Sequence, residues 1–124
     1  MFNYLIKIEY EGTNFVGWQS QKNGKSVQDS VEKALKKVLK TKIRIIGSGR
    51  TDKGVHALSQ YANFKSKIKI KEKKAFLDSM NFFLKKKIIS ILDIKNKNNN
   101  FHARYNAKRR TYEYIIINRQ GNLS

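Results

Sequence analysis

Apolar and polar residues alternate from the start of the chain. Every second position carries an apolar or aromatic side chain: Phe2, Tyr4, Ile6, Ile8 and Tyr10. This is the period of a strand that buries one face, so the spacing predicts a β-strand over 2–10. The glycine-punctuated residues 11–25 predict a loop after it.

A helical period replaces the alternation after this loop. The apolar residues now recur every three or four positions: Val27, Val31, Ala34, Leu35, Val38 and Leu39. The spacing predicts an amphipathic helix over 27–40. Ser26 is its expected N-cap, with Asp29 three residues on in place of the usual Glu or Gln of a capping box. The lysines at 33, 36, 37 and 40 are expected to face solvent.

The remaining pattern predicts one more helix and four more strands. The helix spans 73–86, and its apolar stripe is Phe76, Met80, Phe83 and Leu84. The strands are predicted at 43–46, 55–65, 88–95 and 110–118. The polar run 96–100 (NKNNN) predicts a flexible turn.

The order β-α-β-β-α-β, with one further strand, favours an α+β fold. An antiparallel sheet with both helices on one face is expected, which is the ferredoxin-like or RRM-like plan. At 124 residues the chain predicts a single domain, 1–124. A fold of this kind is compatible with many functions.

Charge narrows the choice of partner. The chain carries 27 basic against nine acidic residues, for a net charge of +18, which suits a polyanion. A general enrichment in lysine would give the same total. Placement is more informative, because four of the six arginines fall within 49–57 and 101–114. Arginines grouped in this way are typical of phosphate or carboxylate contacts.

Other classes of protein are not indicated. Without cysteine there is neither a disulfide nor a thiolate metal site, and two distant histidines do not predict a metal site. The apolar runs are too short to span a membrane. The N-terminus enters a strand directly, so we expect no signal peptide and a cytoplasmic location. At the other end, only two residues follow an expected hairpin turn at 119–122, which predicts a partner strand beyond residue 124.

Asp52 is the residue most suggestive of chemistry. It lies between two glycines in segment 49–57 (GRTDKGVHA), where a tight bend can project its side chain. Arg50 would favour the ionised carboxylate, which could then act as a nucleophile or base. The same string also suits an Asx-turn, in which the carboxylate only caps its own backbone. The residues alone leave both roles of Asp52 open. His56, which follows on the next predicted strand, is expected to be structural.

Two further segments have mixed character. In loop 11–21, Phe15 and Trp18 could stack on bases, but a long loop also needs apolar anchors, and we favour the second role. Segment 101–114 interleaves arginines with aromatic rings. This composition suits a surface that binds unpaired RNA, and it suits equally well a strand with aromatic core residues and a solvated basic flank.

These segments together resemble the TruA family of tRNA pseudouridine synthases. The resemblance rests on motifs spread along nearly the whole chain in the family's order: 10–21 (YEGTNFVGWQSQ), Val27-Gln28, 49–57, Met80-Asn81, 101–104 (FHAR) and Arg110-x-Tyr112-x-Tyr114. The nonapeptide 49–57 is the most specific of them.

The resemblance implies an activity and a site. Asp52 matches the nucleophile that attacks the target uridine, at ribose C1′ or pyrimidine C6, and Arg50 matches an arginine beside it. Tyr112 matches a tyrosine that stacks on the target base, and Arg104 and Arg110 are expected to bind the RNA. The implied substrate is the anticodon stem–loop of tRNA, with no metal or organic cofactor.

The chain departs from the family in length. Family members carry a second, similar domain, so the chain matches an N-terminal catalytic half, and a homodimer is implied for the full-length protein. We therefore expect the chain alone to bind RNA weakly and to lack useful turnover. The alternatives are a non-catalytic basic RNA-binding module and a basic ribosomal protein. For the first, residues 43–48 (IRIIGS) offer none of the aromatics expected on a central strand.

Overall fold

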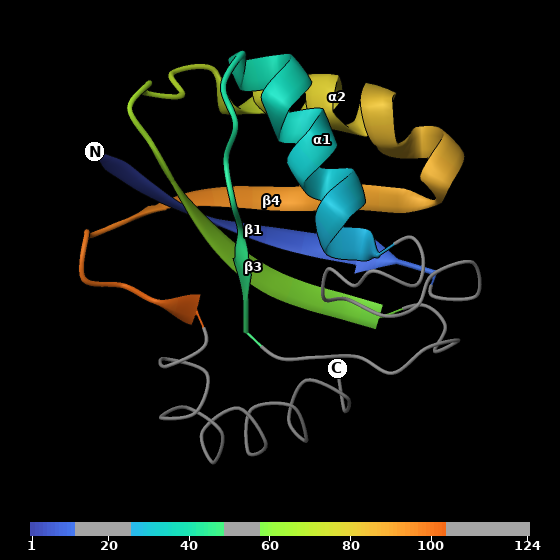
Figure 1. Cartoon of the computed structure of the whole chain (residues 1–124), viewed down its shortest axis with the longest axis horizontal. Coiled ribbons are helices and arrows are strands. Elements are labelled where there is room, and N and C mark those ends of the chain that lie inside the picture. Colours follow the sequence, from blue (N-terminus) through green and yellow to red (C-terminus); the bar gives the residue numbers. More distant parts are fainter. Residues whose placement is uncertain (12–25, 49–57, 104–124) are drawn as a thin grey trace.

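The computed structural model describes residues 1–11, 26–48 and 58–103. Four strands form one antiparallel sheet in the spatial order β2-β3-β1-β4, and α1 and α2 cover the same face of it (Figure 1). The α+β, ferredoxin-like plan is therefore confirmed. The expected strand 110–118 and the turn at 119–122 lie outside the described residues.

The central strands are β1, Phe2–Tyr10, and β3, Leu58–Ser66. The bounds predicted for β1 are confirmed, and from Tyr4 onward its predicted face is buried. On β3, Phe64 lies opposite Tyr4 in the register, and their ring centroids are 5.6 Å apart. The Tyr4 hydroxyl accepts a hydrogen bond from the Ile70 backbone N–H at 2.7 Å, so the buried ring keeps its polar end satisfied.

Helix α1 spans Val27–Leu39, close to the expected 27–40. The Ser26 hydroxyl accepts a hydrogen bond from the Asp29 N–H at 3.0 Å, which confirms the N-cap. Lys40 ends the helix with φ of 60°, and its N–H donates to the Lys36 carbonyl. All members of the predicted stripe are buried except Val38, which is half-buried. The four lysines expected in solvent are exposed.

Helix α2 spans Lys73–Leu84, and a 3-10 turn, Lys85–Lys87, follows it. Phe76, Met80 and Leu84 are buried as expected. The prediction for Phe83 is wrong, because this ring is 40% exposed. It lies on the flank of the helix, where Lys37 of α1 covers part of it, with Nζ 5.2 Å from the ring centroid.

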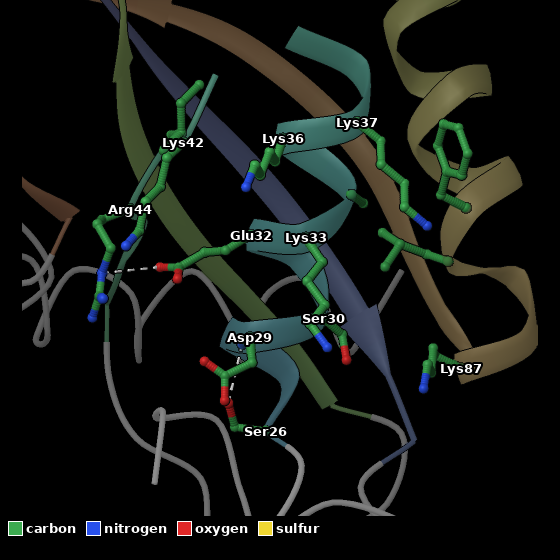
Figure 2. A pocket seen from close by; sticks show the side chains of 14 residues that line it. Ser26, Asp29, Ser30, Glu32, Lys33, Lys36, Lys37, Lys42, Arg44 and Lys87 are labelled. Atoms are coloured by element: carbon green, nitrogen blue, oxygen red, sulfur yellow. Dashed lines mark hydrogen bonds and ion pairs between the residues drawn. The ribbon is translucent and has the colours of Figure 1, made fainter. Parts of the chain in front are cut away.

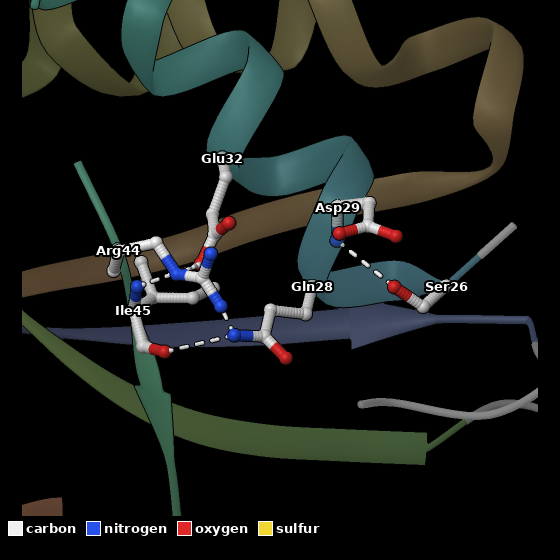
Figure 3. Close-up of polar contacts among 6 residues, drawn as sticks. All are labelled: Ser26, Gln28, Asp29, Glu32, Arg44 and Ile45. Atoms are coloured by element: carbon white, nitrogen blue, oxygen red, sulfur yellow. Dashed lines mark hydrogen bonds and ion pairs between the residues drawn. The ribbon is translucent and has the colours of Figure 1, made fainter. Parts of the chain in front are cut away.

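Strand β2 spans only Ile46–Gly47, so the expected strand 43–46 is wrong in its bounds. The cause is competition for the backbone of Ile45. Its N–H donates to the Glu32 carboxylate at 2.9 Å, and its carbonyl accepts from the Gln28 amide at 3.2 Å (Figure 3). Both partners belong to α1, so the chain pairs with β3 only after it has passed the helix.

Strand β4 spans Ile89–Lys97 and forms one edge of the sheet. It runs two residues beyond the predicted 88–95, so the first two residues of the expected turn 96–100 belong to the strand. The turn that follows β4 is closed by a hydrogen bond from the Phe101 N–H to the Asn98 carbonyl at 3.1 Å.

Candidate functional site

None of the five residues predicted for the site lies among the described residues. Asp52 and Arg50 belong to segment 49–57, and Arg104, Arg110 and Tyr112 follow residue 103. Their roles therefore stay predictions. The structure describes the frame to which both segments are attached, and this frame has specific contacts at each attachment point.

Segment 49–57 joins two neighbouring antiparallel strands, β2 and β3. Its entry is held by Ser48, whose backbone N–H donates to the Tyr61 carbonyl at 2.8 Å. The Ser48 hydroxyl also donates to the Gln60 side-chain oxygen at 2.6 Å, and Gln60 is buried. Its exit leads directly into Leu58, the first residue of β3. The residues on both sides of the segment that carries Asp52 therefore belong to the hydrogen-bonded sheet.

A second motif begins at the same end of the sheet. Tyr10 is the last residue of β1, and its register partners are Leu58 of β3 and Ile89 of β4. The Glu11 N–H continues the pairing to the Ile88 carbonyl at 3.3 Å. The end of β1, which precedes segment 12–25, therefore lies beside Leu58, which follows segment 49–57. The sheet thus brings residues 11 and 58, which flank these two motif segments, to one of its ends, although 46 residues lie between them in sequence.

The third motif is anchored on the face of the sheet opposite the helices. Asn3 donates its side-chain N–H groups to the carbonyls of Asn98 and Phe101, at 2.9 and 3.0 Å. Asn63 accepts from the Ala103 N–H at 2.8 Å and donates to the Asn3 side-chain oxygen at 3.3 Å. The chain after β4 therefore turns back beneath the sheet (Figure 1).

This anchor determines where the arginine-rich segment starts. Asn3 and Asn63 are each 2% exposed, and Ala103, which is equally buried, directly precedes Arg104. Because Asn63 lies on β3, the described chain ends over the strand that segment 49–57 enters. Sequence reasoning missed both asparagines. The one available signal was the presence of an amide side chain within each of two predicted strands. Alternation predicted that this side of the strands faces solvent, so it gave no reason to expect Asn3 and Asn63 to be buried.

Two motif residues with no predicted role hold the frame together. Gln28 bonds to the Ile45 carbonyl and to Glu32, which fixes the approach of the chain to β2. Asn81 of α2 bonds to Ile91 of β4 twice, accepting from its N–H at 2.6 Å and donating to its carbonyl at 3.0 Å. Ile91 lies at an irregularity of the β1–β4 register, where its backbone groups need another partner.

The open face of the sheet combines cations and aromatic rings. Lys7 and Tyr61 are register partners, and the Lys7 ammonium lies 5.9 Å from the Tyr61 ring centroid. At the other end, the Lys97 ammonium lies 5.1 Å from the ring of Phe101. Rings beside cations can stack on bases while the cations bind phosphates.

The described residues hold no group of three or more His, Asp or Glu side chains that could bind a metal ion. No helix within 1–11, 26–48 or 58–103 is long and apolar enough to cross a membrane.

The described residues define a ferredoxin-like α+β domain, and those that flank the glycine- and arginine-rich segments lie at one end of the sheet and on the face opposite the helices. Comparison with known proteins identifies its family. The model of the tRNA pseudouridine synthase family matches residues 6–106. The chain therefore belongs to the tRNA pseudouridine synthase family.

Individual relatives agree with the family match. The chain is 53% identical over 119 residues to a protein of Pelagibacter ubique named tRNA pseudouridine synthase A, covering 96% of this chain and 48% of that protein. Proteins of the same name match from a Thermoanaerobacter species, at 48% identity over 97% of this chain, and from Caldicellulosiruptor saccharolyticus, at 49% over 95%; the matches cover 48% of each relative. The chain thus spans about half the length of these curated relatives.

Proposed function

We propose that this chain is the nucleophile-bearing half of an enzyme that converts uridine to pseudouridine in the anticodon arm of tRNA. The observation that carries the proposal is the family match over residues 6–106, which includes the whole of segment 49–57. Asp52 is the proposed nucleophile, and Arg50 keeps its carboxylate ionised.

The reaction is an isomerisation, so it needs no external oxidant or reductant. The bond between N1 of uracil and C1′ of ribose breaks, and a bond forms between C5 and C1′. The proton on C5 is released, and N1 gains one. Asp52 attacks either C1′ or C6 in this scheme. No step requires a metal or an organic cofactor.

Recognition of the substrate is assigned to the segment after Ala103. Tyr112 stacks on the target base, while Arg104 and Arg110 bind the RNA near it. A uridine in a paired stem must first leave the stack, at a cost on the order of a few kcal/mol that stacking and phosphate contacts offset. The open face supports this assignment, since Tyr61 and Lys7 already present a ring beside a cation there.

The chain alone is proposed to lack useful turnover. It spans about half of its relatives, and the remaining half would supply the other wall of the cleft and further residues near Asp52. The full-length protein is proposed to act as a homodimer.

A non-catalytic RNA-binding module stays the second candidate, because one observation favours it. The lack of aromatic residues in 43–48 does not count against this module, because β2 is an edge strand and the central strands are β1 and β3. On β3, Tyr61 is 40% exposed on the open face, which offers one stacking platform. This module would bind RNA without modifying it.

Asp52→Ala in the full-length protein separates the two candidates. The assay follows tritium released from C5 of labelled uridine in tRNA, with binding measured in parallel. Loss of release with retained binding supports the enzyme. Unchanged release would remove Asp52 as the nucleophile, and wild-type protein that binds without any release would favour the module. Robust release by the 124-residue chain alone would contradict the need for a second half.

A further inference from the structure

A group of cationic side chains surrounds the outer face of α1, on the layer of the domain away from the open sheet face. They come from three parts of the chain and line one open hollow of about 830 Å³: Lys33, Lys36, Lys37, Lys42, Arg44 and Lys87 (Figure 2). We call this set the α1 surface.

The two acidic residues in the hollow do little to offset these charges. Glu32 has only 14% of its side chain exposed, and its carboxylate is occupied by the Ile45 N–H, the Gln28 amide and the Arg44 guanidinium at 3.6 Å (Figure 3). Asp29 lies in the first turn of α1, where a carboxylate complements the positive end of the helix dipole. The exposed charge is therefore dominated by the lysines.

An aromatic edge borders the α1 surface. Phe83 lines the hollow, and Lys37 reaches over its ring. Its neighbour Phe82 is 62% exposed and packs against Phe83 edge to face, with centroids 5.3 Å apart, under the ammonium of Lys85. Exposed rings held beside cations offer contact area to a ribose or base next to a bound phosphate.

We propose that the α1 surface binds the phosphate backbone of a paired RNA stem, as a contact separate from the site that holds the target uridine. Lys33 and Lys37 are one helical turn apart, about 6 Å along the axis, so they can contact neighbouring phosphates of one strand. A hollow also fits the ridge of a nucleic-acid backbone better than the flat plane of a membrane. A second copy of this chain is disfavoured, since each copy carries a net charge of +18.

The choice of RNA among polyanions rests on the proposed function, but the site itself does not depend on catalysis. Binding is therefore the readout. The probe is a synthetic RNA hairpin with a fully paired stem, titrated with the 124-residue chain at several salt concentrations. Vesicles containing phosphatidylserine and a polyglutamate peptide serve as competing anions.

The test variant is K33Q/K36Q/K42Q, which removes three exposed lysines from the α1 surface. The control is K67Q/K69Q/K71Q, which removes three exposed lysines outside it and changes the net charge equally. A third variant, K33R/K36R/K42R, keeps the charge. Thermal unfolding followed by circular dichroism establishes that each variant is folded.

The α1 variant is expected to bind the hairpin on the order of tenfold more weakly than the control. Its salt dependence should fall by about 0.9 in log–log slope per lost phosphate contact, and the arginine variant should keep both values. Equal weakening in the test and control variants would overturn the site, as would a wild-type chain that does not bind the hairpin. Weakened binding to vesicles or polyglutamate, with hairpin binding unchanged, would overturn RNA as the ligand.

The two proposals fail separately. If the α1 variant loses hairpin binding while full-length Asp52→Ala still releases tritium, the α1 surface stands and the catalytic assignment falls. If Asp52→Ala abolishes release and the two lysine variants bind alike, the reverse holds.

Discussion

The Asn63 side chain donates to the Asn3 side chain at 3.3 Å, and this link joins the two central strands to the chain that leads into Arg104. Asn63 also accepts from the Ala103 N–H, while Asn3 holds two carbonyls of the preceding turn. The pair satisfies these backbone groups on a face that the helices do not cover. These bonds hold residues 98–103, which follow the edge strand β4, across β1 and β3.

Asn63→Ala is expected to destabilise the domain by about 2–3 kcal/mol, because it leaves the buried Ala103 N–H and the Asn3 side chain without their partner. Urea unfolding measures the change. Asn96→Ala, an exposed amide of β4, is the matched control and should cost less than about 0.5 kcal/mol. A loss for Asn63→Ala as small as the control's would contradict the anchor.

Asn81 makes a graded prediction. Asn81→Ala removes both bonds to Ile91 and should cost about 1–3 kcal/mol, whereas Asn81→Asp keeps the acceptor for the Ile91 N–H and should cost less. Hydrogen exchange at the Ile91 amide should accelerate in the alanine variant. Asp78→Ala, exposed on the same helix, controls for the loss of a polar side chain. Equal costs for the two Asn81 variants would argue against the bond to the N–H.

Glu32 and Arg44 should contribute very unequally to stability. Glu32→Ala leaves the buried Ile45 N–H unpaired and should cost about 2 kcal/mol. Arg44→Ala should cost less than about 1 kcal/mol, since its side chain is 66% exposed and the ion pair is screened by water and salt. Denaturation of both single variants and the double variant measures the coupling. A coupling energy near the full cost of Glu32→Ala would show that the ion pair is the main role of Glu32.

Two of the three phenylalanines of α2, Phe76 and Phe83, differ in exposure, and their substitution tests whether the Phe83 ring belongs to the core. Phe76→Ala should cost about 3–5 kcal/mol because it leaves a cavity beside Phe64, whose ring centroid lies 6.3 Å away. Phe83→Ala should cost less than about 1.5 kcal/mol, since much of that ring is already in water. Thermal or urea unfolding compares the two. Similar losses would place Phe83 in the core after all.

Ser48 holds the entry to segment 49–57, and its removal should affect turnover more than stability. Ser48→Ala in the full-length protein removes the 2.6 Å bond to Gln60 and is expected to lower kcat severalfold with little change in KM. Its cost in stability should be about 1 kcal/mol. Ser59→Ala, an exposed serine on β3, is the control. A change in KM alone would argue that Ser48 acts on binding.

Periodicity predicted best those elements whose burial is one-sided. β1 and α1 each present one apolar face to the core, so alternation and the three-to-four spacing marked their bounds to within a residue. The prediction of a strand at 43–46 was wrong in its bounds because Ile43 and Ile45 are buried in the core while the Ile45 backbone bonds to side chains of α1. Apolar spacing does not distinguish this arrangement from a strand.

By itself, the sequence determined the fold class, the family resemblance and the charge, since each depends on residue type and order along the chain. The tertiary structure decided what those residues are attached to. Register pairing places Tyr10 beside Leu58, and two buried asparagines carry Ala103 over β3. Such contacts between residues up to 98 positions apart follow from the packing of the sheet and leave no periodic mark on the sequence.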